Sequence, residues 1–527
     1  MRHVIEGRVT PTDRARDPYL ELPFTVGAGV AAIEVRYRHD AGSVLDLGLF
    51  DPTVAPFPSR SGFRGWSGGA REHVMLTPTR ATPGYLPGPI VPGTWYVLLG
   101  LAAVASNGCA YRVEVTLHQH APATVPGLDE PPAPSAHAAA AARVAGAATA
   151  AGGDGTTTAA RDAAAATAAG GDGAAATSPR WYRADLQSHS HHSDARGSLL
   201  DLRAAALARG LEVLAVTDHN TVSHHAPLAA LASPALLWLP GMEVTTYRGH
   251  ANVWGVEGWV DFRIRSEADV ETLVEHVQAR GGLFSVNHPK TSPGCIGCDW
   301  EYGVPAGIDC LEAWQGPWWL RNWESLERYD QLLREGRRVT LVGGSDRHQP
   351  AGPDTDPPDL RLGSPTTWLW LAERSEAAVL AALRAGRTSL SEGPTGPFLT
   401  IEHEASGGVA AGNGAAGTVA AGNGERHRDD RVRARVRGAA GEQLRWIGAH
   451  GVLREVAVET DAFDDAWTPG DVGPFLRAEV VAAASLQARR EAFARAAAGR
   501  ALPFGLDAAM PFERPYRLAL SAPLYFD

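Results

Sequence analysis

Histidine and acidic residues are concentrated in one short stretch of the sequence, QSHSHHSD at 187–194. Three histidines stand within four positions there, beside Asp194, in a chain that has 19 histidines in 527 residues. Imidazole and carboxylate groups at this density can bind a divalent cation if further ligands reach them from elsewhere in the chain. The histidine run by itself does not identify which of its members would bind.

Further residues with metal-ligand side chains follow the apolar runs between 180 and 350. One histidine at a strand end is most often a hydrogen-bonded structural residue, but six predicted strand ends here each carry histidine, aspartate or glutamate. Imidazole and carboxylate without thiolate suit Zn, Mn or Fe in a site of two or three ions. A carboxylate that bridges two ions lowers the pKa of a shared water enough to give hydroxide, a nucleophile for hydrolysis. The residues are His189, Asp194, His219, Glu243, His250, His288, Asp346 and His348.

Helices and strands alternate through the part of the chain that carries these residues. The patterns predict helices at 199–210, 266–280, 323–336 and 375–386, and strands at 211–218, 282–287 and 337–346. Ser266 with Asp269 three residues later is typical of a capped helix start. Such alternation indicates parallel β/α units, in which the active site lies where the strands end.

The segments on either side of this region have the spacing of short strands. Apolar and polar residues alternate in several runs before 120 and again after 430, with turn residues about every ten positions, a pattern typical of antiparallel sandwiches. Two Ala- and Gly-rich segments with internal repeats lack side chains that could form a core, and we interpret them as linkers. We therefore expect an N-terminal β-sandwich-like domain at 1–120, a linker at 121–179, a β/α domain at 180–400, a Gly/Ala-rich loop at 401–430 and a C-terminal β domain at 431–527. No group of catalytic residues is evident in the N-terminal segment.

Six motifs in order resemble those of the PHP (polymerase and histidinol phosphatase) superfamily. They are DLQSHSHHSDA (185–195), AVTDHN (215–220), GMEVTT (241–246), GHANVWG (249–255), VNHP (286–289) and GGSDRH (343–348). LGSPTTWLWL (362–371) and ALRAGRTSLSEGPTGP (382–397) resemble more narrowly the CehA/McbA-type metallohydrolases. The resemblance covers about 182 to 400, and it implies a distorted (β/α)7 barrel, α/β in class, that binds up to three metal ions.

Carried over position by position, the resemblance implies that the eight residues above are metal ligands and that Glu243 is the bridging carboxylate. One position departs from the family pattern, which begins with His-x-His: its first histidine is Gln187 here. An amide oxygen coordinates hard cations but is a poor substitute for imidazole on zinc. The ion shared with His189 and Asp346 would then be weakly held, harder in preference, or absent, and a two-metal site around Glu243 would remain.

Several neighbours of these motifs allow both a functional and an ordinary interpretation. We interpret His191 and His192 as loop or supporting residues, and we expect solvent exposure for His224 and His225. Arg347 and Lys290 are candidates for binding an anionic group of the substrate, although a surface ion pair would explain each almost as well.

The segment 295–323 contains five of the chain's 15 tryptophans. Aromatic residues at this density usually pack in a core, and the alternative is an apolar wall for an aryl substrate. Glu312 is a further acid or base by its position alone. Cys295 and Cys298 form a C-x-x-C pair without two more ligands at zinc-site spacing, and we expect two thiols in a loop. The tryptophans are Trp300, Trp314, Trp318, Trp319 and Trp323.

Composition narrows the classes of partner. The chain has 44% hydrophobic and 20% charged residues and a net charge of −11, which argues against nucleic acid as a main partner. No run of eighteen apolar residues and no secretory leader pattern occurs, so we expect a cytoplasmic protein without a membrane anchor. Four cysteines fit a reducing compartment.

Together these features predict a metal-dependent hydrolase that acts on a small molecule with two or three divalent ions. Its metal-bridging hydroxide would cleave phosphoester bonds, or carboxyl or carbamate ester or amide bonds, and no catalytic side chain beyond the metal ligands is needed. The alternative is a catalytically impaired barrel that binds or scaffolds through its β modules, and Gln187 is the feature in its favour.

Overall fold

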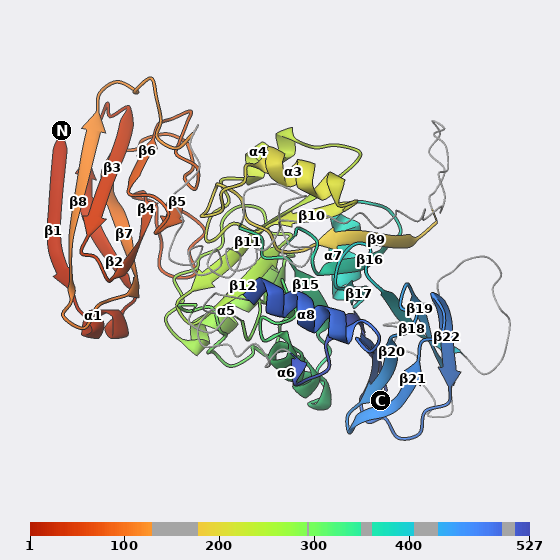
Figure 1. Cartoon of the computed structure of the whole chain (residues 1–527). Helices are drawn as coiled ribbons and strands as arrows, with labels where there is room; N and C mark the ends of the chain where they lie inside the picture. Colours follow the sequence, from red (N-terminus) through yellow and green to blue (C-terminus); the bar gives the residue numbers. More distant parts are fainter. Residues whose placement is uncertain (129–177, 292–294, 349–360, 405–430, 498–511, 527) are drawn as a thin grey trace.

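The computed structural model describes residues 1–128, 178–291, 295–348, 361–404, 431–497 and 512–526 (Figure 1). Most of the two predicted linkers, at 121–179 and 401–430, lies outside these residues. The fold is mixed α/β with many strands and few helices. Among the described residues, no helix has both the length and the apolar character that crossing a membrane requires.

The N-terminal segment folds into two four-stranded antiparallel sheets, ordered β1-β8-β3-β6 and β2-β7-β4-β5. Their strands alternate buried and exposed residues, as β2 does with Leu22, Phe24 and Val26 inside, so the two apolar faces share one core. The elements are β1 Arg2–Val9, α1 Pro11–Arg16, β2 Tyr19–Val26, β3 Ala32–His39, β4 Val44–Phe50, β5 Phe63–Gly68, β6 His73–Leu76, β7 Gly93–Ala103 and β8 Cys109–His118.

A 14-stranded sheet runs through the rest of the molecule in the order β15-β14-β13-β12-β11-β10-β9-β16-β17-β24-β23-β20-β21, and β25 pairs with β23. Strands β9 to β11 pair in parallel, as do β13 to β15, whereas β12 is antiparallel to both neighbours. The first seven strands are β9 Arg180–Asp185, β10 Val213–Val216, β11 Leu237–Thr246, β12 Gly249–Trp254, β13 Leu283–Val286, β14 Cys310–Gln315 and β15 Thr340–Gly344.

Helices connect most of these strands, as the alternating pattern predicts. Capping boxes begin two of them, Ser198 with Asp201 and Ser266 with Asp269, and each satisfies backbone N–H groups that the first turn leaves without partners. The buried residues of α5 recur at helical spacing and face the core. The helices are α3 Leu199–Ala208, α4 His225–Ala230, α5 Glu267–Ala279, α6 Asn322–Arg334 and α7 Glu376–Arg384.

The segments that follow β9 and β15 meet, although five other strands lie between these two in the sheet order. Ser188 and Arg347 form a parallel bridge. The Asp346 amide donates to the Gln187 carbonyl at 3.0 Å, and the His189 amide donates to the Arg347 carbonyl at 3.1 Å. This run of strands therefore curls until the chain segments after its first and last members lie side by side.

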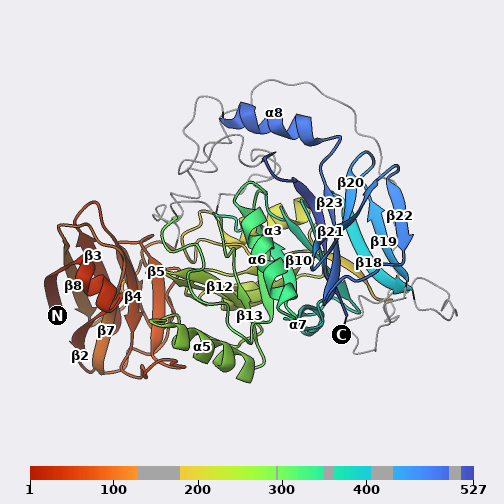
Figure 2. The same cartoon turned by 90° about the horizontal axis from the view of Figure 1, so that it is seen from below.

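The C-terminal strands share the large sheet with the central strands, because β24 pairs with β17. A separate three-stranded sheet, β18-β19-β22, lies beside them, and α8 is a helix within the segment predicted as β, set apart from the sheets in Figure 2. The domain boundaries stay a prediction. These elements are β16 Thr366–Leu371, β17 Thr388–Ser391, β18 Phe398–Glu404, β19 Arg431–Arg437, β20 Gln443–Gly448, β21 Gly451–Ala457, β22 Ala462–Trp467, β23 Phe475–Val481, α8 Leu486–Ala497, β24 Arg517–Ser521 and β25 Leu524–Tyr525.

The N-terminal sheets pack against the central region through aromatic side chains. Phe63 stacks on Trp259 with ring centroids 4.6 Å apart. Tyr247, in the turn between β11 and β12, reaches across and donates its hydroxyl proton to Asp46 Oδ2 at 2.7 Å. A Cβ added at Gly100 would lie only 1.9 Å from the Tyr247 hydroxyl oxygen, so glycine at this position makes room for the tyrosine.

We predict that Gly100→Ala lowers stability by about 1 to 3 kcal/mol, because the added methyl group must displace Tyr247 from its seat. Urea-induced unfolding, followed by fluorescence, measures the change. The matched control is Gly27→Ala in the same module, where a Cβ meets no atom within 4 Å. Equal unfolding midpoints for the two variants would contradict the proposed role of Gly100.

Candidate metal centre

The candidate ligands come from consecutive strands of the curled run. His219 follows β10, Glu243 lies within β11, His250 within β12, and His288 follows β13. His189, Asp346 and His348 lie in the paired segments after β9 and β15. His288 and Asp346 have φ angles of 24° and 50°, a left-handed conformation that side chains with a Cβ rarely adopt and that is concentrated at functional sites.

Glu243 lies at the centre of the cluster and is fully buried. Its Oε2 atom is 2.7 Å from His219 Nδ1 and 3.6 Å from His189 Nε2. Its Oε1 atom is 3.5 Å from His250 Nδ1 and 3.5 Å from His288 Nε2. Four imidazoles thus surround one carboxylate.

Asp194 and Asp346 flank this centre on two sides. Asp194 Oδ1 is 3.5 Å from His219 Nε2 and 3.4 Å from His348 Nε2, and these two nitrogens are 3.1 Å apart. Asp346 Oδ1 lies 2.8 Å from His189 Nε2. All eight residues predicted as ligands therefore meet at one site.

Amide and hydroxyl groups hold these carboxylates and imidazoles in place. Asn287 donates to Glu243 Oε1 at 2.8 Å, Gln315 donates to Asp346 Oδ2 at 2.6 Å, and Thr245 Oγ1 lies 2.6 Å from His219 Nδ1. Such contacts orient ligands and tune their basicity. Asn287, Gln315 and Thr245 were not among the site residues predicted from the sequence, although Asn287 is part of the VNHP motif.

The charges of the cluster depend strongly on one another. Burial raises the pKa of Glu243, but the surrounding histidines outweigh it and hold the pKa well below its usual range. Burial lowers the pKa of His348, but Asp194 and Asp346 raise it to about 10. Neighbouring imidazoles thus favour the charged form of Glu243, as cations would in a metal-loaded site.

The donor set fits divalent metal ions. Three groups of three residues each offer ligand atoms within 4.8 Å of one another, and all the atoms are imidazole nitrogens or carboxylate oxygens from largely buried side chains. This combination suits Zn, Mn or Fe. The groups are His189, His219 and His348; Glu243, His250 and His288; and His189, Glu243 and Asp346.

Gln187 lies inside this centre rather than beside it. Its Nε2 atom donates to Glu243 Oε1 at 2.8 Å and to Asp346 Oδ1 at 3.3 Å, while its Oε1 atom is buried without a hydrogen-bond partner. The amide thus stands between two carboxylates of the third group. Rotation of the amide would turn Oε1 toward an ion held there.

The other histidines of the motifs lie off the cluster. His192 Nδ1 is 2.8 Å from Ser223 Oγ, and the His191 amide donates to Gly197. The expected exposure of His224 is wrong: it is fully buried, with Nδ1 3.1 Å from Asp218 Oδ2. His225 is half-buried, with Nε2 3.0 Å from the Gly241 carbonyl. His224 reaches Asp218, just after β10, and His225 reaches the carbonyl of Gly241 on β11, which accounts for their burial.

The two cations predicted to bind substrate differ in their surroundings. Lys290 donates to Asp299 Oδ2 at 3.0 Å, and Arg321 contacts the same carboxylate, so the ion-pair interpretation of Lys290 is the one that the structure supports. Arg347 is buried. Burial lowers the pKa of Arg209, and the positive charges of Arg361 and Arg347 lower it further. A role for Arg347 in binding substrate stays a prediction.

The tryptophan-rich segment packs in the core, which agrees with the ordinary interpretation. All five tryptophans are buried, and Trp314 and Trp318 pack edge to face. Cys295 and Cys298 are joined in a disulfide, with Cα atoms 5.5 Å apart. This corrects the expectation of two free thiols, because the tight loop brings both side chains together.

Glu312 lies directly behind the ligands. It accepts the His288 amide proton at 2.9 Å and is 2% exposed. Burial raises its pKa well above the usual range, and the nearby Asp346 and Glu243 carboxylates raise it further. Through this hydrogen bond Glu312 positions the backbone of His288.

A pocket opens beside the cluster, and the N-terminal module forms part of its wall. Asp194 and His219 line it from the central region, and Asp46 and Trp66 line it from β4 and β5. The expectation that the N-terminal segment has no group of catalytic residues stays a prediction, and Asp46 was not among the expected site residues. A lone aspartate in a strand carries no signal of a site in another module.

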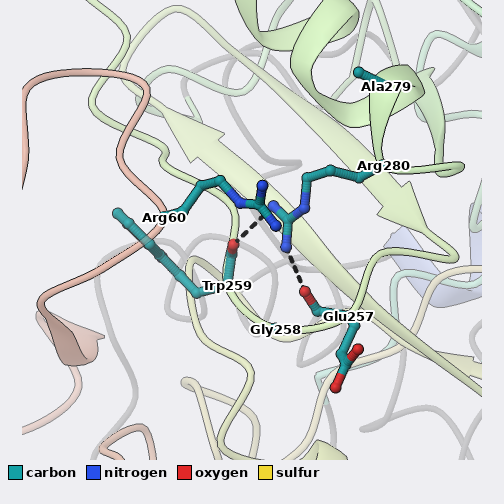
Figure 3. Close-up of a pocket in the computed structure, with 6 residues that line it drawn as sticks. All are labelled: Arg60, Glu257, Gly258, Trp259, Ala279 and Arg280. Carbon is teal, nitrogen blue, oxygen red and sulfur yellow. Dashed lines mark hydrogen bonds between the residues drawn. The ribbon is translucent and has the colours of Figure 1, made fainter.

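A second pocket lies at the same module boundary but has different chemistry. Figure 3 shows the guanidinium groups of Arg60 and Arg280 side by side, while the Glu257 carboxylate points away. Arg280 donates to the Trp259 carbonyl at 3.1 Å. None of the described residues that line this pocket belongs to the histidine and carboxylate cluster.

We predict that Gln187→His tightens metal binding by roughly tenfold, because imidazole is a better ligand for zinc than an amide. Competition with a chelator on the metal-stripped protein measures the affinity. The matched control is Gln278→His, which adds the same imidazole on the exposed face of α5. The same affinity in Gln187→His and in the parent would show that position 187 does not limit binding.

Comparison with known proteins adds three solved structures with low similarity. No protein-family model and no curated protein matches the sequence. A two-domain protein from Bacteroides vulgatus that contains a predicted PHP-like metal-dependent phosphoesterase has 17% identity and a TM-score of 0.35, over 57% of this chain and 91% of that one. The lesion-specific endonuclease EndoQ from Pyrococcus furiosus has 14% identity and a TM-score of 0.29, over 39% of this chain and 56% of that one.

An amidohydrolase from Chromobacterium violaceum, described with bound sulfate and no metal, has 17% identity and a TM-score of 0.23, over 34% of this chain and 93% of that one. None of the three similarities exceeds a TM-score of 0.35. The functional assignment therefore depends on the residues of the site.

Proposed function

We propose that this chain is a metal-dependent hydrolase of the PHP type that acts on a small molecule. One observation carries the proposal: buried imidazoles and carboxylates from successive strand ends converge in three groups whose ligand atoms lie within 4.8 Å of one another. Structural histidines would need only one hydrogen-bond partner each. A cluster of acids and imidazoles as dense as this one suits several cations.

The proposal includes the finer features that the sequence motifs imply. The curled strand run would be the distorted (β/α)7 barrel, the chain would be a CehA/McbA-type member, and two or three divalent ions would be held. Glu243 and the seven predicted residues around it would be the ligands, with Gln187 as a ninth. The joined segments at Ser188 and Arg347 support a closed arrangement of this kind.

The residues of the site have distinct roles in this proposal. Divalent ions bound here would lower the pKa of water and stabilise negative charge that develops on the substrate. Glu243 bridges the two sides of the cluster, while Asn287 and Gln315 fix the carboxylates on which the geometry depends. Burial excludes bulk water and so strengthens each electrostatic contact.

Two classes of bond are compatible with this site: phosphoesters, and carboxyl or carbamate esters or amides. Lys290 and Arg347, the cations predicted to bind substrate, would favour phosphoesters, but Lys290 forms an ion pair with Asp299. The tryptophan segment favoured the second, but those side chains fill the core, and Trp66 is the indole that lines the pocket.

We predict that the Mn- or Zn-loaded protein hydrolyses a nitrophenyl phosphate or a naphthyl carbamate or ester. His189→Ala should lower kcat by at least about 100-fold, because it removes a ligand shared by two of the three groups. His276→Ala, on α5 away from the cluster, is the control that should retain activity. The absence of turnover with any metal on either panel would reject the hydrolase proposal.

The alternative is a binding or scaffolding protein with an impaired centre. The specific observation in its favour is the Gln187 amide, which lies between Glu243 and Asp346 where an imidazole would stand in the family pattern. Metal analysis after metal-replete expression separates the two functions. Less than one ion per chain would favour scaffolding, and we predict at least one ion.

A further inference from the structure

The pocket beside the metal cluster contains an acidic residue from the N-terminal module. Asp46 lies on β4, is 4% exposed, and lines the same pocket as the proposed ligands Asp194 and His219. Its Oδ2 atom accepts the Tyr247 hydroxyl proton, whereas its Oδ1 atom is buried without a hydrogen-bond partner. A buried carboxylate oxygen without a donor costs stability, and such an atom in a pocket calls for an explanation.

Small residues leave this carboxylate uncovered on the pocket side. A Cβ added at Gly68 or at Gly69 would lie 3.6 Å from Asp46 Oδ1. Both glycines line the pocket. A side chain at either position would come into van der Waals contact with Oδ1, so the two glycines leave the pocket side of this carboxylate clear.

The position of Asp46 is built by both modules. Tyr247 holds Oδ2 from the central region, and Gly100 makes room for the tyrosine. Arg71 of the N-terminal module donates to the Ser193 carbonyl at 2.8 Å, next to Asp194. These contacts hold Asp46 in a fixed position relative to the cluster of candidate ligands.

The pKa of Asp46 depends on its burial and on its neighbours. Burial raises the pKa of this carboxyl to about 6, the Tyr247 hydrogen bond opposes the rise, and the Asp194 charge adds to it. A carboxylate in this place attracts a hydrogen-bond donor and repels an anion.

We propose that Asp46 is a specificity-determining residue of the substrate pocket. It accepts a hydrogen bond from an O–H or N–H group of an uncharged or cationic substrate, and it disfavours anionic groups. This inference depends on the proposed function, since it assigns the substrate class of the same site.

The test uses calorimetry to measure how tightly inorganic phosphate binds to the metal-loaded full-length protein. Asp46→Asn keeps the shape of the side chain and removes its charge, so we expect phosphate to bind about three- to tenfold more tightly than in the parent. Glu114→Gln makes the same charge change on the far sheet of the module, where Glu114 pairs with Arg112, and phosphate affinity should not change. Asp46→Ser serves the same purpose if the asparagine variant does not fold.

A second readout distinguishes substrate selection from a structural role. Removal of a buried carboxylate with an unpartnered oxygen should leave the unfolding temperature unchanged or raise it, whereas loss of a purely structural aspartate would lower it. Equal phosphate affinity in Asp46→Asn and the parent, or no phosphate binding by either, would overturn the inference. Metal content is measured on the same samples. If the proposed function fails, the parent itself binds no metal, whereas failure of this inference alone leaves the metal content of the parent intact.

Discussion

The arrangement of the site depends on the burial of Glu243, a carboxylate without solvent exposure. An ionised carboxylate loses its hydration on burial, at a cost of several kcal/mol, unless positive charge and hydrogen bonds replace the water. Four imidazoles and the Asn287 amide surround this group. Burial lowers the pKa of His219 and His288, but nearby carboxylates outweigh it and raise both pKa values, which favours positive charge on these two imidazoles. Divalent ions can supply positive charge with greater charge density.

The fold explains how so many ligands reach one carboxylate. Parallel strands deliver their following residues to one edge of a sheet. The antiparallel β12 places His250 opposite Thr245, two residues after Glu243 on the neighbouring strand. Curling of the strand run then brings His189 next to Asp346 through the paired segments after β9 and β15. The N-terminal module completes the surroundings, because Tyr247 is held between Gly100 and Asp46.

The meeting of the candidate ligands at one site could be predicted from the sequence, because each belongs to a short motif at a strand end, where residue type and position both carry information. The contacts that support this cluster could not be predicted, because Gln315 and Thr245 are ordinary polar residues whose partners lie far away in the chain. The burial of His224 was missed because its partner, Asp218, becomes a neighbour only through the local turn. Asp46 was missed for a related reason: its surroundings depend on how two modules pack, and strand periodicity does not contain that information.

The central claim is that this cluster binds divalent metal ions through Glu243. Anomalous X-ray diffraction from crystals grown with zinc or manganese tests it most directly, because the signal locates the ion independently of any assay. The account predicts at least one anomalous peak about 2.0 to 2.2 Å from a Glu243 carboxylate oxygen, with imidazole nitrogens at similar distances. Peaks only elsewhere in the molecule, or none at full metal loading, would contradict it.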